Sequence, residues 1–284
     1  MILVPHRWLG IDFSGDHSKW GQQCTTGNIW IATVDDSSGS GLVLHDLIQV
    51  QQLPGVASPF SRLAELLSSR QFRAAAIDAP FSIPREYLSG WDYEGLLKTV
   101  AEMPCHNRPF PTGNDFIVAA TGKEPPLEPC KPYRATERIW KERKVNVRST
   151  LWNGARGGAP MTAACLKLLG TAKCPIWPWA SPEENGLIVE AFPAAQLQEW
   201  GISPQKYNGN SADATAKRRF IIDTCLANRI SLPEASLKVI LGSADALDAI
   251  LCAFAAVAVT EGALEIEPGY PEADFEGWIS VHVA

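Results

Sequence analysis

Acidic residues stand inside apolar runs at several separate points of this 284-residue chain, and this feature constrains the fold most. The first is Asp12 in residues 8–16 (WLGIDFSGD), where an apolar run meets a Ser-Gly turn. Such runs, bounded by turn residues, are typical of buried strands. A carboxylate there is costly to ionise unless it is paired or bound to a metal, although Asp12 could instead cap the turn. The same pattern recurs at Asp78 (IDAP), Glu190 (IVEAFP), and Asp245 with Asp248 (DALD). We therefore expect one acidic site assembled from distant parts of the sequence.

The order of the elements predicts an α/β fold with a mixed sheet. Residues 8–13, 28–34 and 42–50 have strand patterns and are expected to form an antiparallel meander. A helix over 60–70 and a short strand over 74–78 follow. A helical crossover of this kind usually returns a strand parallel to the first. Asp12 and Asp78 should then lie side by side at the carboxyl ends of neighbouring strands, where open α/β sheets bind ligands.

Residues 81–186 differ from the rest, because prolines and glycines are dense and strand patterns are missing. Only residues 135–144 and 161–169 have a helical pattern there. We expect a single domain, 1–284, in which 81–186 is an insertion over the carboxyl edge of the sheet. The insertion contains a basic cluster: Lys131, Arg134, Arg138, Lys141, Arg143, Lys144, Arg148 and Arg156. A solvated helix face and a phosphate-binding patch are both open interpretations of this cluster.

The last third of the chain predicts one more strand and three helices. The strand covers 186–192, and the helices cover 193–200, 213–229 and 243–260. The last helix is almost entirely apolar and should be central. Asp245 and Asp248 are three residues apart and share a face near its start. An acid in the first turn also suits the helix dipole, so Asp245 has a structural explanation as well.

Composition narrows the class of protein. No apolar run reaches the ~20 residues that cross a bilayer, and residues 1–6 lack the layout of a signal peptide, so a cytoplasmic protein without a membrane partner is expected. Seven scattered cysteines without a CxxC pair indicate reduced thiols. Cys105, His106, Cys130 and Cys174 match no standard zinc spacing. The net charge of −6 disfavours a general nucleic-acid-coating protein but is compatible with a nuclease, because metal-binding carboxylates add negative charge.

The ordered set of acidic motifs resembles one family. It comprises GID, IDAPF, VEAFP and DALDAILCA, with EGWI near the end of the chain. Over nearly the whole chain it is similar to domain-of-unknown-function family 429, a family of predicted nucleases. The resemblance implies a ribonuclease H-like, five-stranded mixed sheet flanked by helices, with Asp12, Asp78, Glu190 and Asp248 as catalytic acids and Asp245 as a further metal ligand. The DALD segment is also similar to the C-terminal helix of Holliday-junction resolvases of this fold, and residues 133–138 (YRATER) resemble the family's arginine-containing segment.

This set of residues suits two-metal hydrolysis of a phosphodiester. Magnesium and manganese prefer oxygen ligands, so we expect two such ions held by the five acids. Arg134, Arg138 and Arg148 would bind phosphate. The expected partner is nucleic acid or a phosphate-containing small molecule.

Three other classes of protein fit the same residues less well. A nucleotide-binding phosphotransferase of the sugar kinase and chaperone ATPase type would need a richer phosphate loop than Ser14-Gly15, and usually a second domain copy. A non-catalytic binding protein with a ribonuclease H-like fold would leave buried acids without a purpose. A serine hydrolase lacks a GxSxG motif.

Overall fold

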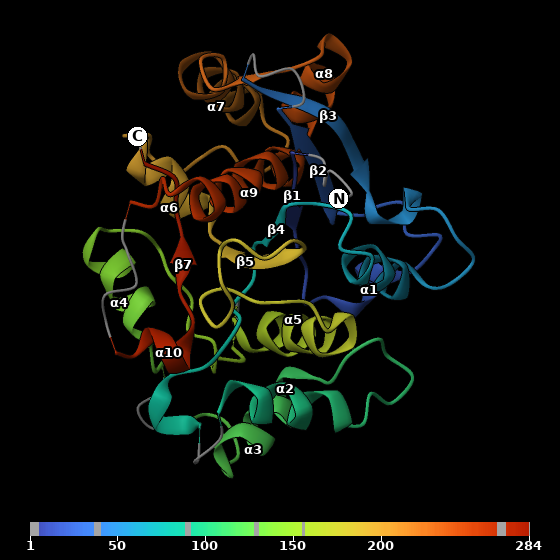
Figure 1. The fold of residues 1–284 in the computed structure, drawn as a ribbon, viewed down its shortest axis with the longest axis vertical. Helices are drawn as coiled ribbons and strands as arrows, with labels where there is room; N and C mark the ends of the chain where they lie inside the picture. The colour runs from blue at the N-terminus through green and yellow to red at the C-terminus, as the bar shows by residue number, and fades with distance from the viewer. Residues whose placement is uncertain are drawn as a thin grey trace.

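A mixed sheet forms the centre of the molecule (Figure 1). The computed structural model describes residues 6–36, 41–88, 92–127, 131–154, 157–265 and 271–283. Within these ranges the strands are β1 (Arg7–Asp12), β2 (Trp30–Asp35), β3 (Leu42–Gln49), β4 (Ala74–Ile77), β5 (Leu187–Ala191), β6 (Ile230–Ser231) and β7 (Ile279–Ser280). Their order across the sheet is β6-β3-β2-β1-β4-β5-β7.

The strand pairings agree with the order predicted from the sequence. β1, β2 and β3 form an antiparallel meander. β4 lies parallel to β1, with Ile11 opposite Ile77, and β5 lies parallel to β4. Because β1 and β4 pair up to this point, Asp12 and Asp78 leave the sheet on neighbouring strands.

The prediction of five strands was wrong, because the described sheet has seven. The five expected strands are the central five. The additional β6 and β7 are two-residue edge strands that pair in parallel with β3 and β5. Two residues are too few to show the alternation by which a strand is recognised in a sequence.

Helices cover both faces of the sheet (Figure 1). α9 crosses one face, and α5 lies with α1 on the other, where α2 and α3 pack outside it. The helices are α1 (Pro59–Ser68), α2 (Tyr93–Glu102), α3 (Gly113–Thr121), α4 (Ala135–Glu142), α5 (Ala159–Ala172), α6 (Pro193–Glu199), α7 (Ala212–Ile221), α8 (Glu234–Gly242), α9 (Ala244–Glu261) and α10 (Ala273–Glu276).

The segment 81–186 is more helical than the sequence indicated. Besides α4 and α5 it contains α2 and α3, which were missed. Each begins at a side-chain cap, Asp92 for α2 and Thr112 for α3. The prolines on either side of α3 conceal both helices in the sequence, because dense proline is typical of loops. α8 and α10 were not predicted either.

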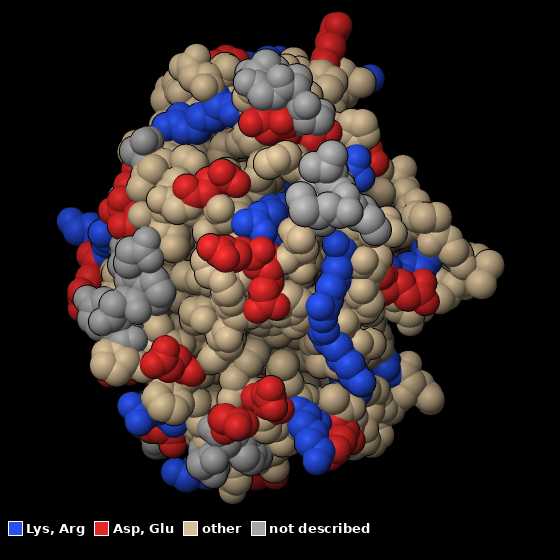
Figure 2. Space-filling view, viewed as in Figure 1, with Lys and Arg blue, Asp and Glu red and all other residues tan. Residues whose placement is uncertain are grey.

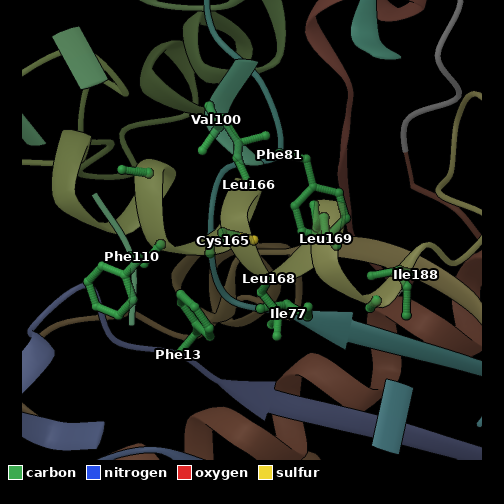
Figure 3. Close-up of a cluster of buried hydrophobic side chains, with 14 of the residues drawn as sticks. Phe13, Ile77, Phe81, Val100, Phe110, Cys165, Leu166, Leu168, Leu169 and Ile188 are labelled. Atoms are coloured by element: carbon green, nitrogen blue, oxygen red, sulfur yellow. The ribbon is translucent and has the colours of Figure 1, made fainter. Parts of the chain in front are cut away.

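The apolar core lies mainly between α5 and the sheet. Figure 3 shows Leu168 of α5 beside Ile77 of β4, and Leu169 on the side of Ile188 of β5. All four side chains are buried. Residues of the predicted insertion therefore complete the main core of the sheet, in addition to lining its carboxyl edge.

Helix α9 packs unusually close to the sheet at Gly10. A Cβ atom at this position would lie 2.0 Å from the carbonyl oxygen of Ala249 and 2.4 Å from the nitrogen of Ala253. The missing side chain therefore allows the helix backbone to touch β1. This contact fixes where α9 starts relative to the end of β1.

In the described ranges no single helix has the length and apolarity to cross a bilayer. α8 and α9 reach that limit only as a pair, and they are bent by 116° at the break between them. Most of α9 is buried inside the protein.

Candidate functional site

Four of the five predicted acids line one cavity of about 1000 Å³. Asp12 ends β1, and Asp78 follows β4, where its backbone N–H donates to the carbonyl oxygen of Ile11 at 2.9 Å. Asp245 and Asp248 come from the first two turns of α9, whose start is capped by Ser243. Because Asp248 directly precedes Ala249, the close contact at Gly10 brings this carboxylate to the end of β1.

The carboxylates share one electrostatic environment. Burial, and then the charges of Asp248, Asp245 and Asp78, raise the pKa of Asp12 well above its ordinary value. Burial raises the pKa of Asp78 to about 7, with help from Glu190 and Asp245 and against the opposing charge of Arg148.

The two acids of α9 are affected in the same direction. The pKa of Asp248 is raised well above its ordinary value by burial, by Asp78 and by Asp245. The pKa of Asp245 is raised mainly by burial, against the opposing charges of Lys19 and Arg218. Among the described residues none of the four acids forms a salt bridge, so the cluster gathers negative charge that no direct cationic partner neutralises.

Tyr207 positions one of these carboxylates. Its hydroxyl donates to Oδ1 of Asp248 at 2.9 Å, and its ring is buried. Arg218 in turn binds the backbone carbonyl oxygen of Tyr207. Tyr207 was not among the predicted site residues, because nothing in the sequence around it marks it as a neighbour of a helix 41 residues further on.

Glu190, the fifth acid, lies beside the cluster but is engaged differently. Glu190 stands opposite Ile77 in the pairing of β4 with β5, one position before Asp78. Its side chain therefore points to the same face of the sheet as the side chain of Ile77. Its two carboxylate oxygens accept from both terminal nitrogens of Arg134, and Oε2 also accepts from the backbone N–H of Phe81. Its lone pairs are therefore largely used by the protein.

Arg134 is completely buried within this ion-pair network. Besides Glu190 it binds Oε1 of Glu137 at 3.1 Å and the backbone carbonyl oxygen of Glu276 at 2.9 Å. Burial raises the pKa of Glu137 to about 7 against the opposing charge of Arg134. With these partners Arg134 connects α4 to β5 and α10, and its guanidinium is engaged by Glu137, Glu190 and the Glu276 carbonyl oxygen.

The other basic residues of segment 131–156 differ from one another in the contacts that they make. Arg148 lines the cavity. Arg138 is exposed and binds the carbonyl oxygen of Tyr133, whereas Arg143 pairs with Glu199 and Glu265. Lys131 and Lys141 lie over the rings of Trp152 and Tyr133. Arg156 lies outside the described residues. A second lining cation, Arg108, was not singled out in the sequence, because it stands alone between turns.

The turn after Asp12 has a packing reason for its glycine. A Cβ on Gly15 would lie 2.4 Å from the backbone nitrogen of Met161, at the start of α5. The glycine thus lets the turn approach the helix, and no phosphate is needed to explain it.

Oxygen donors dominate the site, which fits a hard divalent cation such as magnesium or manganese. In the described part of the chain no three His, Cys, Asp or Glu side chains are arranged as a preformed metal site. The acids would therefore have to converge by side-chain rotation on binding. In these ranges Cys105, His106 and Cys174 form no such site, and Cys130, the fourth residue considered as a zinc ligand, lies outside them.

Fold and site together define an α/β protein with an acidic cavity at the carboxyl edge of its central strands. Residues 10–273 match the family described as "Protein of unknown function (DUF429)", and the chain belongs to this family. Comparison with curated proteins and with solved structures gives no match.

Proposed function

We propose that this protein is a metal-dependent phosphodiester hydrolase, a nuclease in the broad sense, built on a ribonuclease H-like sheet. The gathering of Asp12, Asp78, Asp245 and Asp248 on one cavity carries the proposal. Their pKa values are raised by burial and, after it, by mutual repulsion, and bound cations would relieve this repulsion. The central strands, a meander followed by two parallel strands between helical layers, support the fold assignment.

Each residue has a role that follows from its surroundings. Asp12 interacts electrostatically with Asp248, Asp245 and Asp78 and would be the central metal ligand, with Asp78 and Asp248 as further ligands. Tyr207 holds the Asp248 carboxylate in position. Arg148, on the wall next to Asp78, is placed to bind a phosphate oxygen. Glu190 and Arg134 belong to the same proposal as supports of the wall, because their side chains bind each other.

Magnesium or manganese, when bound, would supply an activated water and stabilise the departing oxygen. The protein contributes the oxygen donors and the orientation of the phosphate. The raised pKa of Asp78 also means that protons compete for the site below about pH 7.

Metal binding is the direct test. Magnesium and manganese are titrated by calorimetry into the wild type, Asp12→Asn and Asp46→Asn, the last being the same change on an exposed position of β3. Binding that is lost in Asp12→Asn and kept in Asp46→Asn is expected. Hydrolysis of bis(p-nitrophenyl) phosphate and of single- and double-stranded DNA and RNA is then measured for the same three proteins.

Two results would contradict the proposal. Equal metal binding by the wild type and Asp12→Asn would remove Asp12 from the site. ATP binding by a protein that binds neither metal alone would favour the phosphotransferase class instead.

A further inference from the structure

A second cavity of about 290 Å³ adjoins the acidic one. Asp78, Asp248 and Arg148 line both cavities, so these three residues stand on the boundary between them. A phosphate held by Arg148 would consequently have a cavity on each side. The two volumes are near the lower and upper ends of the range usual for small-ligand sites.

The smaller cavity suits an uncharged organic group. Its apolar lining includes Pro80, Val147, Phe192, Pro193, Pro204 and Ile279. Three further charged residues, Arg134, Glu137 and Glu190, also line it, but they bind one another and offer no net positive charge. Asn208 adds an amide group that can bind the polar edge of a base. The described cations of this cavity are Arg148 at the boundary and Arg134, which is already paired with Glu137 and Glu190.

The larger cavity is polar and suits the part of the substrate that carries phosphate. Its described cations are Arg108 and Arg148. Its lining amides are Asn28, Asn114, Asn153, Asn208 and Asn210. Amides and two arginines can hold one phosphate group and a sugar through hydrogen bonds.

Long duplexes require a different surface. Their binding depends on many Lys and Arg residues that neutralise successive phosphates. Figure 2 shows one narrow run of Lys and Arg side chains, and elsewhere on that face the described Lys and Arg are interspersed with Asp and Glu. The net charge of −6 also disfavours a long, highly charged duplex.

We infer that the substrate is a compact phosphodiester of about dinucleotide size. This inference rests on the hydrolase function proposed above. Its nucleoside-like leaving group occupies the smaller cavity, and the remainder occupies the larger one. In the hydrolysis a bond forms between the water oxygen and phosphorus, and the bond from phosphorus to the nucleoside oxygen breaks. One water proton ends on the departing hydroxyl, and the other passes to solvent.

Asn146→Trp tests this arrangement, because it places a bulky ring at the smaller cavity from an exposed position. Asn228→Trp is the matched control, an exposed turn residue that lines neither cavity. Calorimetry without metal measures the binding of a dinucleoside monophosphate. We expect Asn146→Trp to weaken it about tenfold or more, and Asn228→Trp to leave it unchanged. Circular dichroism checks that both variants are folded.

Hydrolysis with magnesium adds a second measurement. Asn146→Trp should slow cleavage of the dinucleoside monophosphate but not of the methyl ester of a nucleoside monophosphate, whose leaving group is small. Unchanged dinucleotide binding by Asn146→Trp, or preferred cleavage of duplex DNA, would overturn the inference and leave the hydrolase function standing. Failure to cleave any phosphodiester would reject the hydrolase function, while metal-free binding still decides whether the smaller cavity receives a nucleoside.

Discussion

Replacing Asp78 with asparagine should make the metal-free protein more stable at neutral pH. Burial, with Glu190 and Asp245, raises the pKa of Asp78 from 3.8 to about 7 in spite of Arg148. Between these two values the native protein keeps a proton that the unfolded chain has released. The unfolding free energy therefore falls as pH rises through this window, and the loss is complete above about pH 7. Asparagine has no proton to lose and escapes this penalty.

The size of the effect follows from the two pKa values. A difference of about three pKa units corresponds to about 4 kcal/mol. Asp78 keeps some contact with solvent at the cavity wall, which weakens the penalty, so we expect a gain of about 2 kcal/mol at about pH 8. Near pH 4 the wild type and Asp78→Asn should differ little, because the native carboxyl is then neutral.

Urea unfolding in the presence of a chelator measures this difference, with Asp46→Asn as the control. Magnesium should reduce or reverse the difference in unfolding free energy between the wild type and Asp78→Asn, because an ion that binds the native state stabilises the wild type more than the variant. If Asp78→Asn is no more stable than Asp46→Asn at neutral pH without metal, the argument from buried, mutually repelling acids is refuted.

Three further substitutions test other parts of the structure. Arg134→Ala should lower the unfolding free energy by about 3–5 kcal/mol in urea, because it leaves Glu137 and Glu190 buried without their partner; a smaller loss than for an exposed arginine such as Arg138→Ala would contradict the network. Tyr207→Phe should cost about 1 kcal/mol of stability and weaken manganese binding in calorimetry, because Asp248 loses its donor; unchanged binding would remove the positioning role. Gly10→Ala should cost about 3 kcal/mol or more, or prevent folding, because its Cβ would meet the α9 backbone; wild-type thermal stability would disprove the close contact.

Much of the fold follows from local sequence patterns. The apolar runs of β1, β4 and β5 and the long apolar helix α9 have strong periodic or compositional patterns, and the structure confirms them. The neighbouring position of Asp12 and Asp78 follows from chain order, because a helical crossover returns a strand beside its predecessor. Short strands such as β6 and β7 cannot be predicted from local patterns, because two residues are too few to show a periodic alternation.

The sequence by itself determined which side chains were candidates for the site and at which strand ends and helix start they lie. Only the tertiary structure decided which of them face the cavity and which are occupied by partners. Arg134 and Arg148 belong to one basic cluster in the chain, yet Arg134 is enclosed by Glu137, Glu190 and the Glu276 carbonyl, whereas Arg148 lines the cavity beside Asp78. The physical reason is that an ion pair depends on distance in space, and the partners of Arg134 come from strands and helices up to 142 residues away.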